Sequence, residues 1–283
     1  MDHQMTIGLI GAGNMAEALI RGLLGRAVVP GGDVWVTNRT NTARLEALAA
    51  RYGVRIARQK QLVAAASTVL ILAVKPKDMA EVLGEISSLV AAHHLIISVA
   101  AGIPLGTIEE ALPAGPVIRA MPNTSAAVQE SATVLASGSR ADETHMSTAA
   151  RIFEAVGDVA VVDEEFLDVV TALSGSGPAY VYHLVEAMIH AGSELGLDGT
   201  LARRLAVQTL VGAARMLSAT SEDPGDLRRR VTSPGGTTMA ALEILEARGF
   251  AQSVREAVGR AARRSRELAA EFGGPEGRNG AGS

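Results

Sequence analysis

Two closely spaced glycines near the start of the chain are the first residues that could do chemistry. Residues 11–16 read Gly-Ala-Gly-Asn-Met-Ala, the G-x-G-x-x-A form of the dinucleotide-binding fingerprint, between an apolar run and a helical pattern. Gly11 permits a tight turn, Gly13 lets backbone N–H groups approach a pyrophosphate, and Ala16 lets helix and strand pack closely. An ordinary glycine-rich turn is the alternative. Because unpaired N–H groups at a helix N-terminus favour an anion, we expect these residues to contact a dinucleotide: Gly11, Ala12, Gly13, Asn14 and Met15.

The end of the second predicted strand, residues 33–38, indicates which dinucleotide binds. In an NAD-binding fold an acidic residue normally ends this strand and binds the ribose 2′-hydroxyl, but here the strand runs into Asn38-Arg39-Thr40. An arginine with amide and hydroxyl neighbours suits a 2′-phosphate, which a carboxylate would repel. We therefore expect these three residues to bind NADPH, with NADH as the weaker alternative. A solvated loop charge is the other interpretation of Arg39, and Arg55 is a weaker second candidate.

A second set of polar residues lies far along the chain, in a glycine-rich turn. Residues 231–238 read Val-Thr-Ser-Pro-Gly-Gly-Thr-Thr and separate two helical patterns. At a helix N-terminus, the Ser-Pro-Gly-Gly-Thr-Thr part offers free backbone N–H groups and three hydroxyls, the groups that hold a small carboxylate. Serine and threonine also favour helix N-caps, so a capped helix start that needs no ligand is an equal alternative on chemistry alone.

Composition narrows the class of protein. The chain has 283 residues, enough for two modest domains, and is 48% hydrophobic with only 3% aromatic residues, so its cores must be built from Ala, Val, Leu and Ile. A net charge of −4 gives no broad basic surface, and we expect no nucleic-acid partner. The absence of cysteine excludes disulfides and cysteine nucleophiles and suits a cytoplasmic protein. We expect no signal peptide and no membrane-spanning segment.

Strand and helix patterns alternate through the first part of the chain. In an open parallel sheet the carboxyl ends of the strands line the ligand crevice. The loops that read AVKP, SVAAG and MPNTS should therefore wall the nicotinamide half of the site. Within them, Lys75 fits a surface or cofactor-facing charge better than a catalytic amine, and Asn123 fits either a ligand contact or a simple turn. Further strands and a final helix–strand pair are expected at 54–56, 68–74, 95–99, 116–121, 142–156 and 159–162.

Beyond residue 165 the pattern is helical only, which predicts a second domain. Four main helices are expected, at Ala179–Leu195, Leu201–Leu217, Thr237–Arg248 and Ser253–Phe272. The predicted fold is thus α/β, with a Rossmann-type doubly wound sheet at 1–164 and an all-α domain at 165–272. Because the helical domain is rich in Ala, Leu and Val faces, we expect it to form a homodimer that shares each site. Residues 273–283 are glycine-rich and polar, and we expect them to be disordered.

Together these stretches resemble the pyrroline-5-carboxylate reductases over nearly the whole chain. The shared segments are GLIGAGNMA, LAVKP, ISVAAG, MPNTS, ALSGSGPAY and, most specifically, DLRRRVTSPGGTTMAALEILEARG. The resemblance implies an N-terminal Rossmann domain and a helical dimerising domain, often assembled into a decamer. It also implies transfer of a hydride from NAD(P)H to the C=N carbon of Δ1-pyrroline-5-carboxylate, which gives L-proline. A protonated imine is already electrophilic, so this chemistry needs no metal and no strong base.

The resemblance also implies roles for individual residues. The substrate carboxylate and ring nitrogen would be bound by Ser233, Gly236, Thr237 and Thr238, with the Thr238 hydroxyl at the nitrogen as the catalytic group. The cofactor-contacting loops would be formed by Val74, Lys75, Pro76, Val99, Ala100 and Ala101, with Asn123 nearby. Two positions depart from the family pattern: Ser125 replaces a common proline, and Arg55 an asparagine.

Two other functions fit parts of the sequence. The β-hydroxyacid dehydrogenases, which this sequence also resembles in part, carry a Gly-Ser-Gly turn before a long helix. That resemblance implies a lysine on the long helix that acts as acid and base. Here residues Val181–Leu195 contain no lysine, and none occurs after Lys77. A dinucleotide-sensing module would need no polar ligand cluster facing the nicotinamide, and the Thr-Ser-Pro-Gly-Gly-Thr-Thr turn argues against it.

Overall fold

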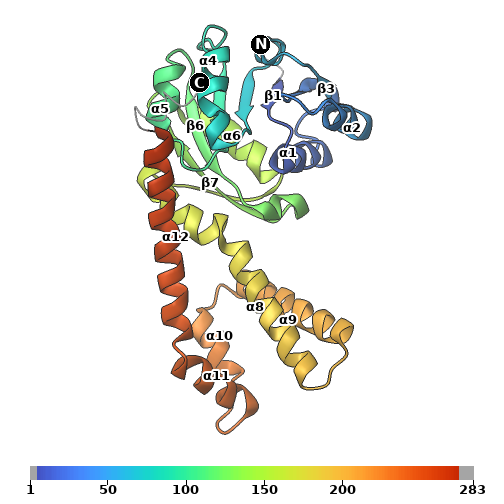
Figure 1. The fold of residues 1–283 in the computed structure, drawn as a ribbon, viewed down its shortest axis with the longest axis vertical. Helices are drawn as coiled ribbons and strands as arrows, with labels where there is room; N and C mark the ends of the chain where they lie inside the picture. Colours follow the sequence, from blue (N-terminus) through green and yellow to red (C-terminus); the bar gives the residue numbers. More distant parts are fainter. Residues whose placement is uncertain (1–4, 274–283) are drawn as a thin grey trace. The chain divides into compact units, whose positions relative to one another are not determined.

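The computed structural model of the chain describes residues 5–273, which form two compact units (Figure 1). Of the described residues, the first unit comprises 5–176 together with 260–273, and the second comprises Gly177–Gly259. The first unit therefore extends past residue 164 and also includes the end of the last helix. The domain division at residue 164 stays a prediction, and the tail expected to be disordered lies outside the described residues beyond Gly273.

An eight-stranded sheet forms the centre of the first unit, with the strand order β3-β2-β1-β4-β5-β6-β7-β8. All neighbouring strands are parallel except β6 and β7, which run antiparallel. The switch of strand order beside β1 is that of a doubly wound dinucleotide-binding fold, and it confirms the predicted α/β class. The strands are β1 Ile7–Ile10, β2 Val34–Thr37, β3 Arg55–Ile56, β4 Val69–Leu72, β5 Leu95–Ser98, β6 Val117–Met121, β7 Ser131–Ser137 and β8 Gly157–Val161.

Helices flank this sheet. They are α1 Asn14–Gly25, α2 Thr42–Tyr52, α3 Lys60–Ala65, α4 Met79–Ile86, α5 Leu105–Ala111, α6 Glu143–Glu154 and α7 Leu167–Val170, followed by a π-helical turn at Thr171–Gly175. Short 3₁₀ turns lie at Gly31–Asp33, Pro76–Asp78, Thr124–Val128 and Glu164–Phe166. Strand β7 was not expected from the sequence, and neither were α3 and α5.

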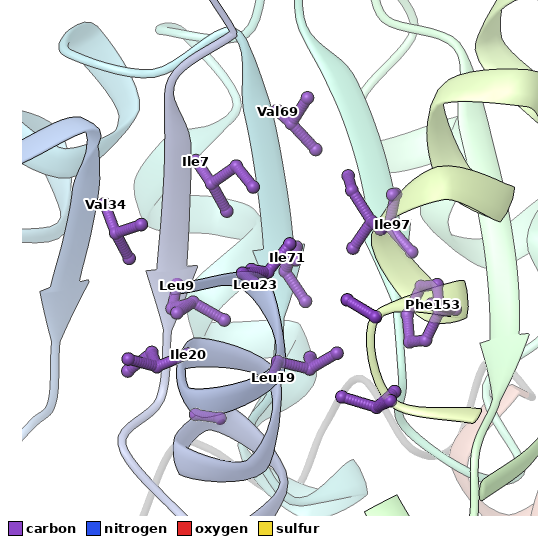
Figure 2. Packing of buried hydrophobic residues seen from close by; sticks show 14 of the residues in the cluster. Ile7, Leu9, Leu19, Ile20, Leu23, Val34, Val69, Ile71, Ile97 and Phe153 are labelled. Atoms are coloured by element: carbon purple, nitrogen blue, oxygen red, sulfur yellow. The ribbon is translucent and has the colours of Figure 1, made fainter. Parts of the chain in front are cut away.

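The central strands are buried at every position, as their continuous apolar sequence requires. Apart from Gly8 in β1 and Ser98 in β5, the strands β1, β4 and β5 consist of Ile, Leu and Val, and all their residues are buried. Figure 2 shows Ile7 and Leu9 of β1 in the same apolar cluster as Leu19 of α1 and Phe153 of α6. A second apolar cluster, which includes Ile10 and the inner residues of α4, contains the side chains that point the other way. Because both faces of the sheet are packed, its strand ends are fixed in position.

The second unit is entirely helical, as expected. Its elements are α8 Gly177–Glu194, α9 Gly199–Thr220, α10 Pro224–Arg230, α11 Thr237–Ala247 and the first part of α12 Phe250–Gly273. Within residues 177–259, all of which the structure describes, Ala202 and Ala206 are the only buried residues. Large apolar side chains such as Leu184 and Met188 of α8 are exposed. Among residues 5–273 there is no helix that combines the length and the apolar character needed to cross a membrane.

Candidate cofactor and substrate sites

The turn after β1 can be built only with glycine at position 11. Gly11 has φ +113°, a conformation that side chains disfavour. Its N–H donates to the carbonyl of Thr37 at 2.9 Å, and a Cβ at this position would lie 2.3 Å from the carbonyl oxygen of Ala73. The turn thus brings the ends of β1, β2 and β4 within contact distance, as the fingerprint predicts.

Helix α1 begins directly after this turn with no side chain capping it. Its N-cap residue is Gly13, which has no side chain that could accept a hydrogen bond from the first turn. A Cβ added at Gly13 would meet no atom within 4 Å, so the space beside the helix start is open. Ala16 is fully buried against the sheet. An uncapped helix start beside open space fits an anionic group such as a pyrophosphate.

A cavity of about 540 Å³ opens at the carboxyl ends of β1, β2 and β4. Eight of the predicted cofactor residues line it: Gly11, Ala12, Gly13, Asn38, Arg39, Thr40, Val74 and Lys75. Seven others do not: Asn14, Met15, Pro76, Val99, Ala100, Ala101 and Asn123. Ala100 belongs to an apolar core cluster, so only its backbone is available to a ligand.

The loop after β2 is held by its own asparagines. The Asn38 side-chain oxygen accepts hydrogen bonds from the backbone N–H groups of Thr40 at 2.9 Å and Asn41 at 2.8 Å. Asn41 in turn caps α2 by accepting from the backbone N–H of Arg44 at 2.9 Å. This arrangement fixes the backbone on both sides of Arg39 while leaving its side chain outside these hydrogen bonds.

Arg39 pairs with two carboxylates that also line the cavity. Its Nη1 is 3.1 Å from Oε2 of Glu81 and 3.5 Å from Oδ1 of Asp78. The arginine side chain is 59% exposed, so it is neither fully solvated nor fixed by burial. Arg55 does not line the cavity; its guanidinium carbon lies 5.4 Å from the ring centroid of Trp35. Of the two arginine candidates, the structure thus brings only Arg39 to the cavity.

Several lining residues lie outside the predicted set, and three of them offer polar groups that the sequence analysis did not single out. Arg44 donates from Nε to the carbonyl of Ala12 at 3.1 Å and pairs with Glu17. The Arg44 guanidinium hydrogen bond, more than any other contact, lowers the pKa of Glu17 below its usual value. Lys60 places its Nζ 2.5 Å from Glu85. These basic residues lie on α2 and α3, whose sequences carry no motif.

The third is Thr37, which is completely buried at the end of β2. Within residues 5–273 its hydroxyl has no hydrogen-bond partner. A buried hydroxyl without a partner is costly, and this one lines the cavity. The observation supports the presence of a polar ligand there. A hydrogen bond from that ligand would remove the cost.

The loop after β6 is organised by Asn123, which is 9% exposed. Its side-chain amide donates to the Ser174 carbonyl at 3.1 Å, and its side-chain oxygen accepts from the Ser125 N–H at 3.0 Å. A proline at position 125 would lack that N–H, so the serine allows a hydrogen bond that a proline could not make. Because the amide is engaged on both sides, the structure favours a positioning role for Asn123 over a cofactor contact.

The turn at Ser233–Thr238 in the second unit begins α11 without a side-chain cap. Gly236 is the N-cap residue, and a Cβ there would lie 2.3 Å from Oγ of Ser233. Among the described residues, the hydroxyls of Ser233, Thr237 and Thr238 make no hydrogen bond to the chain. The alternative in which these hydroxyls cap the helix is therefore not what the structure contains. The N–H groups of the first turn and three hydroxyls remain available to a ligand.

Two sequence families match separate parts of the chain. One, described as NADP oxidoreductase coenzyme F420-dependent, matches residues 6–102, and the other, described as pyrroline-5-carboxylate reductase dimerisation, matches residues 164–268. Over 270 residues, the chain is 42% identical to pyrroline-5-carboxylate reductase 1 of Bacillus subtilis strain 168; the match covers 95% of this chain and 91% of that relative. The chain belongs to the pyrroline-5-carboxylate reductase family.

Solved structures of pyrroline-5-carboxylate reductases share the fold. The Coxiella burnetii protein matches with a TM-score of 0.89 and 36% identity, over 94% of this chain and 99% of that one. The Plasmodium falciparum protein, solved with NADP bound, matches with a TM-score of 0.83 and 28% identity, over 94% and 98%. The resemblance predicted from the motifs is confirmed. The chain is an oxidoreductase, and its reaction is that of pyrroline-5-carboxylate reductases, the final step of proline biosynthesis.

Proposed function

We propose that this chain reduces Δ1-pyrroline-5-carboxylate to L-proline with NADPH, and that the turn Ser233–Thr238 binds the substrate. The start of α11 carries this proposal, because it combines an uncapped helix N-terminus with three hydroxyls that have no partner among the described residues. Such a start offers a carboxylate both N–H donors and a favourable dipole. A helix that needed only a cap would use one of these hydroxyls for it.

The cavity at the end of β1 would hold the cofactor. Gly11, Ala12 and Gly13, followed by Asn14 and Met15, would hold the pyrophosphate, while Asn38, Arg39 and Thr40 would hold the 2′-phosphate. The open space beside Gly13 and the unpartnered hydroxyl of Thr37 both fit such a ligand. The nicotinamide half would contact Val74, Lys75, Pro76, Val99, Ala100 and Ala101, while Asn123 would hold the neighbouring loop after β6 in position. When bound, NADPH supplies the hydride, and NADH would serve as the weaker alternative.

The substrate residues have a simple task. Ser233, Gly236 and Thr237 would hold the carboxylate, which fixes one end of the ring. The Thr238 hydroxyl would accept a hydrogen bond from the iminium N–H, which orients the C=N carbon toward the hydride donor. Because the protonated imine is already electrophilic, the chain needs only to position the substrate and to bind its charged groups.

Assembly is part of the same proposal. Exposed apolar side chains on α8, α9 and α11, such as Leu184, Leu205 and Ile244, support a homodimer formed through the second unit, because so many apolar groups are not left in water by a stable protein. The further assembly of dimers into a decamer and the cytoplasmic location stay predictions.

The proposal is tested with the purified full-length chain. Oxidation of NADPH should depend on added pyrroline-5-carboxylate, and proline should accumulate in equal amount. The comparison substrate is 1-pyrroline, the same cyclic imine without the carboxylate, which should react with a much lower kcat/KM if the α11 turn recognises that group. Binding of NADPH without turnover of either imine would indicate a dinucleotide sensor instead. Equal turnover of both imines would mean that the α11 turn does not recognise the carboxylate.

A further inference from the structure

Three charged residues from two separate segments of the chain meet in the cofactor cavity. Arg39 belongs to the loop after β2. Asp78 ends the 3₁₀ turn Pro76–Asp78 that follows β4, and Glu81 lies in the first turn of α4. All three line the cavity, and Nη1 of Arg39 lies 3.1 Å from Glu81 and 3.5 Å from Asp78. The arginine that we assign to the 2′-phosphate is therefore already paired with two carboxylates.

This arrangement can be opened without disturbing the fold. The side chains of Arg39, Glu81 and Asp78 are 59%, 45% and 27% exposed. Ion pairs with such access to water contribute little to stability, because solvent and salt screen them and the long side chains lose entropy. Both carboxylates contact Nη1 of Arg39 alone, whereas a phosphate dianion carries more charge and can accept two parallel hydrogen bonds from the guanidinium. Arg39 can thus exchange one partner for the other.

The exchange would have a cost that depends on the cofactor. A 2′-phosphate placed beside Arg39 would lie in the same cavity as the carboxylates of Asp78 and Glu81, which repel it. NADH has a hydroxyl at that position and meets no such repulsion. Carboxylates are also the groups that accept the ribose 2′-hydroxyl in NAD-binding folds. The two acids therefore oppose the preference that Arg39 creates.

We propose that Asp78 and Glu81 set the cofactor preference of this enzyme by competing with the 2′-phosphate for Arg39. They reduce the advantage of NADPH and keep NADH usable. This inference rests on the proposed role of Arg39 in binding NADPH. According to this inference, cofactor preference depends on the start of α4 as well as on the fingerprint and the loop after β2.

The test is a set of equilibrium dissociation constants for NADPH and NADH, measured by titration calorimetry on the full-length chain. Asp78→Asn combined with Glu81→Gln should tighten NADPH binding by about threefold to tenfold and change NADH binding by less than about twofold. The matched control is Glu46→Gln on α2, an exposed carboxylate outside the cavity lining, which changes net charge without approaching Arg39. It should alter neither constant.

An Arg39→Gln variant separates this inference from the proposed function. Arg39→Gln should weaken NADPH binding. In the Arg39→Gln background, the gain in NADPH affinity from Asp78→Asn with Glu81→Gln should shrink, because the arginine for which the acids and the 2′-phosphate compete is no longer there. Two outcomes would show that the competition is wrong while the cofactor assignment stands. In the first, Arg39→Gln weakens NADPH binding but Asp78→Asn with Glu81→Gln leaves NADPH binding unchanged. In the second, the double variant gains its full NADPH affinity even in the Arg39→Gln background. If Arg39→Gln leaves NADPH binding unchanged, the 2′-phosphate site itself is wrong, and the inference falls with it.

Discussion

The side-chain amide of Asn123 donates a hydrogen bond to the carbonyl of Ser174 at 3.1 Å, and so joins the loop after β6 to the π-helical turn at Thr171–Gly175. π-Helical turns are rare and occur often at functional sites. Here the turn directly precedes α8. The side chain of Met121 lies so close to Gly175 that a Cβ there would approach it to 2.8 Å. The end of β6 and the π-helical turn are therefore fitted to each other.

The first prediction concerns this joint. Asn123→Ala should lower the free energy of unfolding by about 1–3 kcal/mol, because it removes both side-chain hydrogen bonds and leaves buried groups unpaired. The dissociation constant of NADPH should change little if the residue only positions the loop. Chemical denaturation and calorimetric titration measure the two quantities. A large loss of NADPH affinity at unchanged stability would restore Asn123 to the cofactor contacts.

The second prediction concerns the 2′-phosphate. Arg39→Asp should weaken NADPH binding by about 1.5–3 kcal/mol more than NADH binding, since it replaces a charged hydrogen-bond donor by a repelling carboxylate. The measurement is the pair of dissociation constants at one fixed salt concentration. Arg55→Asp is the matched control, because Arg55 lies over Trp35 and outside the cavity lining. Equal weakening of both cofactors by Arg39→Asp would contradict the assignment.

The third prediction concerns the substrate turn. Thr238→Ala should reduce kcat/KM for pyrroline-5-carboxylate by about 10- to 100-fold, or about 1.4–2.7 kcal/mol, the range for a hydrogen bond to a charged group. Both kcat and kcat/KM should fall, because the bond orients the C=N group for the reaction. NADPH affinity should not change, and Thr238→Ser should recover most of the activity. Unchanged kinetics in Thr238→Ala would mean that the turn does not serve the reaction.

The fourth prediction concerns assembly. The second unit should form a dimer that buries well over about 2,000 Å² in total, as obligate partners do. Replacing an exposed apolar residue of α8, in Met188→Glu, should lower the sedimentation coefficient toward that of a monomer. Glu186→Gln on the same helix, at an exposed polar position, should leave it unchanged. An active wild-type monomer at micromolar concentration would overturn the prediction.

The fifth prediction concerns pH. The hydrogen bond from Arg44 lowers the pKa of Glu17 from its usual value near 4.5, so the ionised carboxylate stabilises the folded state. That contribution is complete above the unfolded value and is lost as pH falls through the lower, folded value. Glu17→Gln should therefore be less stable than the wild type at neutral pH, and the difference should shrink in acid below about pH 4.5. Denaturant unfolding across pH measures it. A difference that stayed constant into acid would exclude this linkage.

The parts of the fold and site that could be read from the sequence are those where backbone geometry dictates residue type. Gly11 sits at positive φ against a carbonyl, and no other residue would serve there. Strands β1 and β4 are buried on both faces, which forces an unbroken apolar run. Such constraints leave a signature in a single sequence.

Other features leave none. Strand β7 alternates between buried and less buried positions only as far as Leu135, and it includes small residues such as Ser131 and Ala132, so its apolar contrast is weak. Arg44 and Lys60 reach the cavity from helices whose own patterns are ordinary. Their placement depends on how distant elements pack. The pairing of Arg39 with Asp78 and Glu81 could not be foreseen for the same reason, since it joins residues from two separate segments of the chain.

The burial of only Ala202 and Ala206 within residues 177–259 has a consequence for how the enzyme behaves on dilution. Helices that bury so little within one chain gain most of their stability from tertiary partners. Folding of the second unit and association of chains then become one equilibrium, so that the apparent melting temperature rises with protein concentration. The turn Ser233–Thr238, which we propose binds the substrate, belongs to this unit. Turnover per chain would consequently fall when the protein is diluted, before any residue of the first unit has unfolded.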